Sequence, residues 1–389
     1  MYGCFYLNRA NIAPLIPLIH ADLNISYTRI GLMTSLFYLM YTAGQMPFGW
    51  LGDRYGPRRI ITIGGIGSAM SCVFLFFSGS PAILYVILAV NGVMQSSGWG
   101  PSVKLLGNWF SGSRFGLVLG TFTTSISLFT VIAYFLSGYL GETYGWRTAI
   151  VVPAMILLLC SLAFWLIVRD TPQVQSIGES RETVKKNSLH GDFRTLIGSR
   201  QMWIAFLSFS CLMYIQYGVT IWLPTYLQGK YGINIVQASA IASLYFFVGL
   251  LARPSGGYIS DRFFAGRRNP IILVGMFLMD LFLLGLSVSG DIGSSVIFIT
   301  LSGFCFQLFS FLFFTIPGRV LPDNLVSTGS SFLDTGGHLG SLCAMLTLGW
   351  LIDFTGSFQS IIIALLFAGL LGLFAVCFLK ESHNCQKSQ

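Results

Sequence analysis

The chain has 389 residues, of which 54% are hydrophobic and 9% charged, and its mean hydropathy is +0.73. These few charged residues cannot cover the surface of a soluble protein of this size. The composition therefore excludes a soluble globular protein and indicates an integral membrane protein. The net charge of +8 does not indicate nucleic-acid binding, because no segment offers a soluble basic face.

Twelve apolar runs follow one another along the chain. A helix that crosses the hydrocarbon core of a bilayer needs about 20 predominantly apolar residues. The sequence therefore predicts an all-α membrane protein with twelve transmembrane helices. No charged n-region or cleavage site precedes the first run, so we expect a transmembrane helix there and not a cleavable signal peptide. The runs lie near residues 1–20, 29–51, 60–78, 82–107, 115–140, 147–168, 202–227, 235–259, 270–289, 293–317, 325–352 and 357–379.

The longest polar stretch divides the twelve runs into six and six. Its mixed charges predict a mobile or partly helical linker. We expect an N-terminal six-helix bundle at 1–168, a cytoplasmic linker at 169–200, a C-terminal six-helix bundle at 201–380 and a cytoplasmic tail at 381–389. Most of the basic residues fall on one side when alternate loops are counted, which places both termini in the cytoplasm of a protein of the inner or plasma membrane.

Two similar loops mark an internal repeat. The loop "GWLGDRYGPRRI" follows the second run, and "GGYISDRFFAGRRNPI" follows the eighth. Glycine and proline suit a tight turn, and the basic residues keep each loop on the cytoplasmic side. The two loops resemble the GxxxDRxGxRR motif of the major facilitator superfamily, and the resemblance covers essentially the whole chain. It implies two six-helix bundles in pseudo-symmetry that rock about a substrate site near the midplane.

In that superfamily the Asp-Arg loop is thought to latch the cytoplasmic helix ends in one state. The resemblance implies this gating role here, with a purely topological role as the alternative. The gating candidates are Asp53, Arg54, Arg58, Asp261, Arg262, Arg267 and Arg253, the last because it precedes Pro254 near the cytoplasmic end of the eighth run.

Three further segments narrow the resemblance. They are "YLNRANIAPLIP" in the first run, "NGVMQSSGWGPSVKLLGNWF" in the fourth and "QYGVTIWLPTYL" in the seventh. They look like the organophosphate:phosphate antiporter family, with a weaker likeness to the anion:cation symporter family. Both families carry anions, so the resemblance implies secondary active transport of a small organic anion such as an organophosphate, a sugar acid or a carboxylate.

Arg9 lies within the first apolar run. A cation at the centre of a bilayer costs roughly 2.5 to 3.5 kcal/mol, so we expect Arg9 to face an internal cavity. Its planar guanidinium fits phosphate or carboxylate with two parallel hydrogen bonds. An arginine that matches this position binds substrate in the antiporter family. The alternative is that Arg9 pairs with a helix carbonyl or an aspartate across the bundle.

The repeat places Gln216 opposite Arg9. Pro17 and Pro224 mark the same point in the first and seventh runs, and the same offset relates Arg9 to Gln216. The antiporters usually carry arginine at both positions. The departure argues for a substrate with one negative charge and with hydroxyl or carbonyl groups that Gln216 can bind.

Several other residues are candidates for the substrate site. Lys104 matches a position that is usually basic in both families; it either supplies a second cation to the cavity or extends toward the cytoplasmic interface. Four tyrosines lie either in the cavity wall or in the core. They are Tyr6, Tyr38, Tyr214 and Tyr217.

Coupling is the remaining question for a secondary transporter. The symporters typically have an acid just before the arginine and another in the fourth helix, where this chain has Asn8 and Gln95, which favours exchange; Gln95 is kept as a substrate-binding candidate. Asp334 and His338 are spaced i, i+4 and so share one helix face. We expect this pair either to couple transport to protons or to form a structural contact within the bundle. Asp280 lies in mid-span and is a coupling group, a structural residue or the counter-ion of an internal arginine.

No motif for an enzyme is visible. The chain has no P-loop and no HExxH, and its histidines and cysteines are dispersed, so we expect no catalysis, cofactor or metal. We expect the protein to be a monomer whose partners are a small anionic substrate and the lipid bilayer. The alternatives are a proton-coupled carboxylate symporter that uses Asp334 and His338, and an anion sensor that does not transport. Drug efflux is disfavoured because a promiscuous apolar cavity would not need Arg9.

Overall fold

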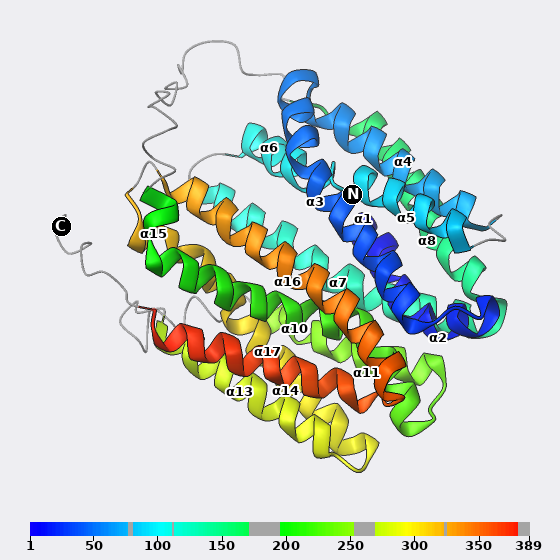
Figure 1. Ribbon diagram of the computed structural model, residues 1–389. Coiled ribbons are helices and arrows are strands. Elements are labelled where there is room, and N and C mark those ends of the chain that lie inside the picture. The colour runs from blue at the N-terminus through cyan, green and yellow to red at the C-terminus, as the bar shows by residue number, and fades with distance from the viewer. Residues whose placement is uncertain (77–80, 111–112, 171–194, 253–268, 323–324, 380–389) are drawn as a thin grey trace, which may run out of the picture.

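The computed structural model describes residues 1–76, 81–110, 113–170, 195–252, 269–322 and 325–379 (Figure 1). In this part of the chain all regular structure is helical. The first eight helices are α1 (Tyr2–Ala10), α2 (Ile12–Leu23), α3 (Tyr27–Tyr55), α4 (Pro57–Phe76), α5 (Pro81–Gln95), α6 (Trp99–Trp109), α7 (Ser113–Tyr144) and α8 (Trp146–Ile167). The later helices are α10 (Arg200–Tyr231), α11 (Ile235–Phe247), α13 (Asn269–Val288), α14 (Ile292–Phe309), the 3₁₀ helix η1 (Ser310–Thr315), α15 (Pro317–Val320), α16 (Val326–Thr355) and α17 (Gln359–Cys377).

The helices follow the predicted order of spans. Among the described residues, 10 helical segments are long and apolar enough to cross a membrane. The α1–α2 pair and α3 occupy the positions of the first two predicted runs. Together with the 10 segments they make up the predicted twelve spans, and the all-α architecture is confirmed. Helices suit a bilayer because they satisfy their own backbone hydrogen bonds where lipid offers none.

Two predicted spans that carry substrate-site candidates are interrupted near their middle. Pro14 has no N–H to donate to the carbonyl of Ala10, and α1 gives way to α2 at this point. In the fourth span α5 ends at Gln95, and the hydroxyls of Ser96 and Ser97 bond to backbone carbonyls three residues earlier at 2.6 and 2.7 Å. Such bonds compete with the helical ladder and bend it. Both interruptions lie beside residues predicted for the substrate site.

The helices pack in two groups. Within the first, α3 packs on α5, α4 on α8 and α1 on α7; within the second, α10 packs on α16 and α17, and α13 on α14. We call α1–α8 the N-terminal group and α10–α17 the C-terminal group. The domain boundaries at 168 and 200 stay predictions.

The two groups meet mainly where α3 packs on α16 and α7 on α11. The approach is closest where glycines replace side chains: a Cβ on Gly31 would lie 2.4 Å from the carbonyl oxygen of Met345, and one on Gly349 would lie 2.5 Å from that of Tyr27. These contacts lie toward the end of the molecule that carries Asp353, which we call the Asp353 end. Toward the opposite end, which carries Asp53, α3 and α16 diverge (Figure 1).

Candidate substrate-binding site

Arg9 is the centre of the candidate site. It lies at the end of α1 and is 6% exposed. Its Nε donates to Oε1 of Gln95 at 2.9 Å, and its guanidinium carbon lies 4.6 Å from the ring centre of Tyr6 and 4.3 Å from that of Tyr41. Two aromatic faces stabilise a cation without neutralising its charge.

The charge of Arg9 has no acidic partner in the described part of the chain. Its Nη2 is buried and has no hydrogen-bond partner there. The expected alternative, an aspartate or a helix carbonyl as the partner of Arg9, is not what the structure shows, because a neutral amide takes that place. A buried unpaired donor on a cation is costly, so the geometry favours an anionic ligand that supplies the missing acceptor.

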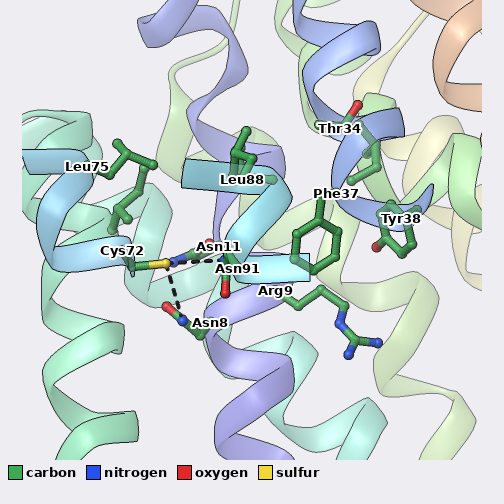
Figure 2. Close-up of a pocket in the computed structure, with 13 residues that line it drawn as sticks. Asn8, Arg9, Asn11, Thr34, Phe37, Tyr38, Cys72, Leu75, Leu88 and Asn91 are labelled. Carbon is green, nitrogen blue, oxygen red and sulfur yellow. Dashed lines mark hydrogen bonds between the residues drawn. The ribbon is translucent and has the colours of Figure 1, made fainter. Parts of the chain in front are cut away.

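A network of neutral polar side chains holds Gln95. Nε2 of Gln95 lies 3.4 Å from Oδ1 of Asn91, which also accepts from Ser68 at 2.7 Å. Asn8 donates to Ser68 at 3.2 Å and to the Cys72 sulfur at 3.4 Å. Figure 2 shows Asn8 and Asn91 directed at Cys72, with the Arg9 guanidinium turned away from them on the side of Tyr38. The network fixes the amide of Gln95 and thereby the orientation of Arg9.

A small cavity lies behind Arg9, between α1, α3, α4 and α5. The cavity has a volume of about 30 Å³. Oδ1 of Asn8 and Nδ2 of Asn11, which belong to residues that line the cavity, are buried and have no partner in the described part of the chain. One or two water molecules would fit and satisfy these atoms, whereas an organic anion would not fit.

Aromatic and polar contacts join Arg9 to the C-terminal group. The ring of Tyr41 lies 6.0 Å from that of His338, and Gln45 Nε2 lies 3.4 Å from His338 Nε2. Tyr38 meets Tyr217 edge to face at 4.9 Å. Tyr38 and Tyr217 thus meet between the two groups, and the predicted role of these two residues and of Tyr6 in the cavity wall stays a prediction.

Gln216 lies on α10, one residue before Tyr217. Its Nε2 lies 3.4 Å from Oγ1 of Thr220, and its Oε1 is buried and unpartnered among the described residues. Gln216 therefore retains an acceptor for a ligand hydroxyl. Tyr214 is placed differently: its hydroxyl bonds to Thr347 of α16 at 2.6 Å, within the C-terminal group. Its predicted role in the cavity wall stays a prediction.

The three coupling candidates lie in two places. Oδ2 of Asp334 lies 3.5 Å from Nε2 of His338, which is the nitrogen that Gln45 also approaches. The pair on α16 therefore touches the N-terminal group. Asp280 instead lies on α13 against Gly369 of α17, 5% exposed, and neither carboxyl oxygen has a partner in the described residues. The interpretation of Asp280 as the counter-ion of an internal arginine is not supported.

The Asp53 loop contacts its own helix group. Lys104 pairs with Asp53 at 2.7 Å and donates to the carbonyl of Gly52 at 3.2 Å. Of the two alternatives for Lys104, the structure favours the one in which it extends toward the end of its span and does not add a second cation beside Arg9.

Two arginines of the same loop region pack on aromatic rings. Arg58 lies 4.2 Å from the ring centre of Trp165, and its backbone N–H donates to Asp170 at 2.7 Å. Arg54 lies 5.3 Å from the ring centre of Trp50. Their gating role stays a prediction. Arg253, Asp261, Arg262 and Arg267 lie outside the described residues.

Sequence reasoning missed three residues of this region: Tyr41 contacts Arg9, Gln45 contacts His338, and Asn91 contacts Gln95. A signal was present for the first two, because Tyr38, Tyr41 and Gln45 recur at intervals of three and four residues and so share one face of the second span. Asn91 precedes Gln95 by four residues on the fourth span in the same way.

Comparisons with known proteins agree with this architecture. The sequence model of the Major Facilitator Superfamily matches residues 1–332 and residues 227–388. A probable sulfoacetate transporter of Cupriavidus necator is 24% identical over 373 residues, which are 92% of this chain and 86% of that protein. A glycerol-3-phosphate transporter of Bacillus subtilis is 27% identical over 305 residues, 71% of this chain and 67% of that protein.

Among solved structures, a bacterial homologue of the human lysosomal transporter Spinster, in an inward-facing and unoccupied conformation, has the same fold. Its TM-score is 0.80 at 16% identity, covering 97% of this chain and 92% of that one. The chain therefore belongs to the Major Facilitator Superfamily. It is a multi-pass membrane transporter and not an enzyme, as the sequence predicts.

Proposed function

We propose that the protein transports a small organic anion by alternating access and that Arg9 binds the anion. The observation that carries the proposal is the buried guanidinium of Arg9, which has no acidic partner in the described residues and one unpartnered nitrogen. The relatives named as a probable sulfoacetate transporter and a glycerol-3-phosphate transporter have anions as their named substrates, which supports the same substrate class. We expect the Asp53 end and both termini to be cytoplasmic, because short cytoplasmic loops retain Lys and Arg.

We infer that transport is an exchange of one anion for another. A proton-coupled mechanism needs a carboxylate or histidine that senses the substrate. The two side chains that stand where the symporters have acids, Asn8 and Gln95, are amides that bond to neutral groups and, for Gln95, to Arg9. Neither amide can carry a proton, so counter-transport of a second anion accounts best for release from Arg9.

The charge of the preferred substrate follows from Gln216. Sulfoacetate and glycerol 3-phosphate can both carry two negative charges, whereas the site here has one described arginine at its centre. We therefore expect a monoanion with a hydroxyl or carbonyl group that reaches Gln216.

Replacing Gln216 with arginine is expected to change the charge preference. A second guanidinium adds a charge-assisted hydrogen bond for a second negative charge, so the inhibition constant of a phosphate monoester against uptake of a labelled sugar acid falls about tenfold. The matched variant Gln216→Glu repels every anion and weakens both ligands. An unchanged ratio of the two inhibition constants in Gln216→Arg would contradict the placement of Gln216 in the site.

A second candidate function rests on the Asp334–His338 pair, because the pair meets Gln45 of the opposite group. In that case a proton and a carboxylate move together. The exchange mechanism predicts that His338→Gln keeps trans-stimulated uptake within about threefold of wild type, since only polar packing is lost. Uptake driven by an imposed pH gradient in wild type and lost in His338→Gln would favour the symporter.

A further inference from the structure

An eight-residue pattern occurs twice at the Asp353 end. The segment "GYLGETYG", residues 138–145, ends α7, and "GWLIDFTG", residues 349–356, ends α16. Each begins with glycine, has an acid at its fifth position and ends with glycine. Gly145 and Gly356 have φ values of 84° and 64°, in the left-handed region that glycine adopts without strain, and they follow the last residue of their helices.

The acid of the second segment caps a helix of the opposite group. Oδ1 of Asp353 accepts the backbone N–H of Tyr27 at 3.1 Å, and its Oδ2 accepts the backbone N–H of Thr28 at 2.7 Å and its hydroxyl at 2.5 Å. The next N–H, of Arg29, is taken by Ser26 at 3.3 Å. The first three N–H groups of α3 are therefore satisfied, two of them from another helix group.

The acid of the first segment repeats this contact in the other direction. Oε2 of Glu142, on α7, accepts the backbone N–H of Ile235 at the start of α11 at 3.1 Å, while Asn234 caps the N–H of Gln237 at 2.9 Å. Ser26 and Asn234 occupy the same place before their helices. They follow Asn24 and Gly232 by two residues, and both of these have left-handed backbones, with φ of 49° and 64°.

The first glycine of each segment allows the close approach. A Cβ on Gly349 would lie 2.5 Å from the carbonyl oxygen of Tyr27, and one on Gly138 would lie 2.7 Å from Oγ of Ser239 and 3.4 Å from the carbonyl oxygen of Ile235. The same sequence pattern thus builds the same contact twice, between α16 and α3 and between α7 and α11.

We propose that Asp353 and Glu142 form a paired gate, in which a carboxylate of each helix group holds the Asp353 end closed by capping the first turn of a helix in the other group. The N-terminus of a helix carries unsatisfied N–H groups and a partial positive charge, which a carboxylate stabilises. Both bonds cross between the groups, so they exist only while this end is closed. The gate rests on the alternating access of the proposed function, and it is independent of the substrate.

The test is hydrogen–deuterium exchange of the whole transporter in lipid nanodiscs, without substrate. Asp353 uses both oxygens as acceptors, and asparagine can replace only one of them. Asp353→Asn is expected to raise the exchange rate of peptides from 27–35 and 345–353 about tenfold, the effect of losing one charge-assisted hydrogen bond, and to lower that of 99–109 at the opposite end. Glu142→Ala should act likewise, and Glu142→Gln less, because its amide oxygen can still accept from Ile235.

The matched control is Asp291→Asn. Asp291 caps the N–H of Ser294 at 2.8 Å at the start of α14, within the C-terminal group. The Asp291→Asn variant should change the hydrogen–deuterium exchange rate only near residues 291–294. The gate is wrong if Asp353→Asn changes exchange only at 27–29, with no fall at 99–109, since that is the result of a lost cap alone. Because hydrogen–deuterium exchange is measured without substrate, a result that disproves anion transport would not affect the proposal of the gate.

Discussion

Replacing Arg9 with glutamine is expected to lower the initial rate of trans-stimulated anion uptake by a factor of about 30 or more in proteoliposomes. The loss of a buried charged partner costs about 2 to 5 kcal/mol, which is more than a factor of 10 in affinity at the lower limit and well above 100 at the upper. Glutamine is shorter than arginine and keeps a neutral amide NH₂ with two N–H donors, so the change removes the charge and the planar fork of the guanidinium.

Arg9→Lys separates charge from geometry. Lysine keeps the charge, but it cannot hold Gln95 through Nε and present two parallel donors to the anion at once. We expect an uptake rate between those of wild type and Arg9→Gln, about tenfold below wild type. The same melting temperature for all three proteins serves as the control for folding. Wild-type rates in Arg9→Gln would show that Arg9 does not bind the substrate.

Replacing Gly31 with valine is expected to abolish transport with most of the fold retained. A Cβ at this position would lie 2.4 Å from a backbone oxygen of α16, which cannot move without displacing the helix. The overlap therefore prevents the two helix groups from closing at the Asp353 end, and a transporter that cannot close one end cannot complete its cycle. The measurement is counterflow, together with a melting curve.

Gly340→Val is the matched comparison. A Cβ on Gly340 would lie 1.9 Å from the carbonyl oxygen of Ser210, but this contact joins α16 to α10 within the C-terminal group. We expect it to lower the melting temperature more than Gly31→Val does, because no step of the cycle relieves the overlap. If Gly31→Val retains wild-type counterflow, the closure of α3 on α16 is not part of transport.

The sequence alone predicts the spans, the superfamily and the burial of Arg9, because each of these depends on local composition or on a motif. An arginine in an apolar run must be buried in protein, whichever helix faces it. Its surroundings were harder to predict. Gln95 lies 86 residues away on a helix that is interrupted at Ser96, and an interruption changes which side chains face the first span. The Lys104 alternatives could not be separated for the same reason.

The contacts between the two helix groups could not be predicted from the periodicity of apolar residues. Asp353 and Tyr27 are 326 residues apart, and an acid at a helix end reads as an ordinary exposed residue until the opposite helix is placed against it. Asp280 shows the converse: hydropathy marks it as costly in mid-span, but only the structure shows that it packs against Gly369 and that neither carboxyl oxygen has a hydrogen-bond partner among the described residues. A sequence of this kind predicts which residues are unusual, and the packing decides what they contact.

The most direct test of anion transport at Arg9 is counterflow with the wild-type protein. Proteoliposomes are loaded with unlabelled phosphate, a sugar phosphate, a sugar acid or a small carboxylate, and uptake of the labelled form is measured beside Arg9→Gln. We predict that at least one organic anion stimulates its own uptake from the opposite side and that this stimulation is lost in the variant. No trans-stimulation with any anion, or equal uptake by both proteins, would contradict Arg9-dependent anion exchange.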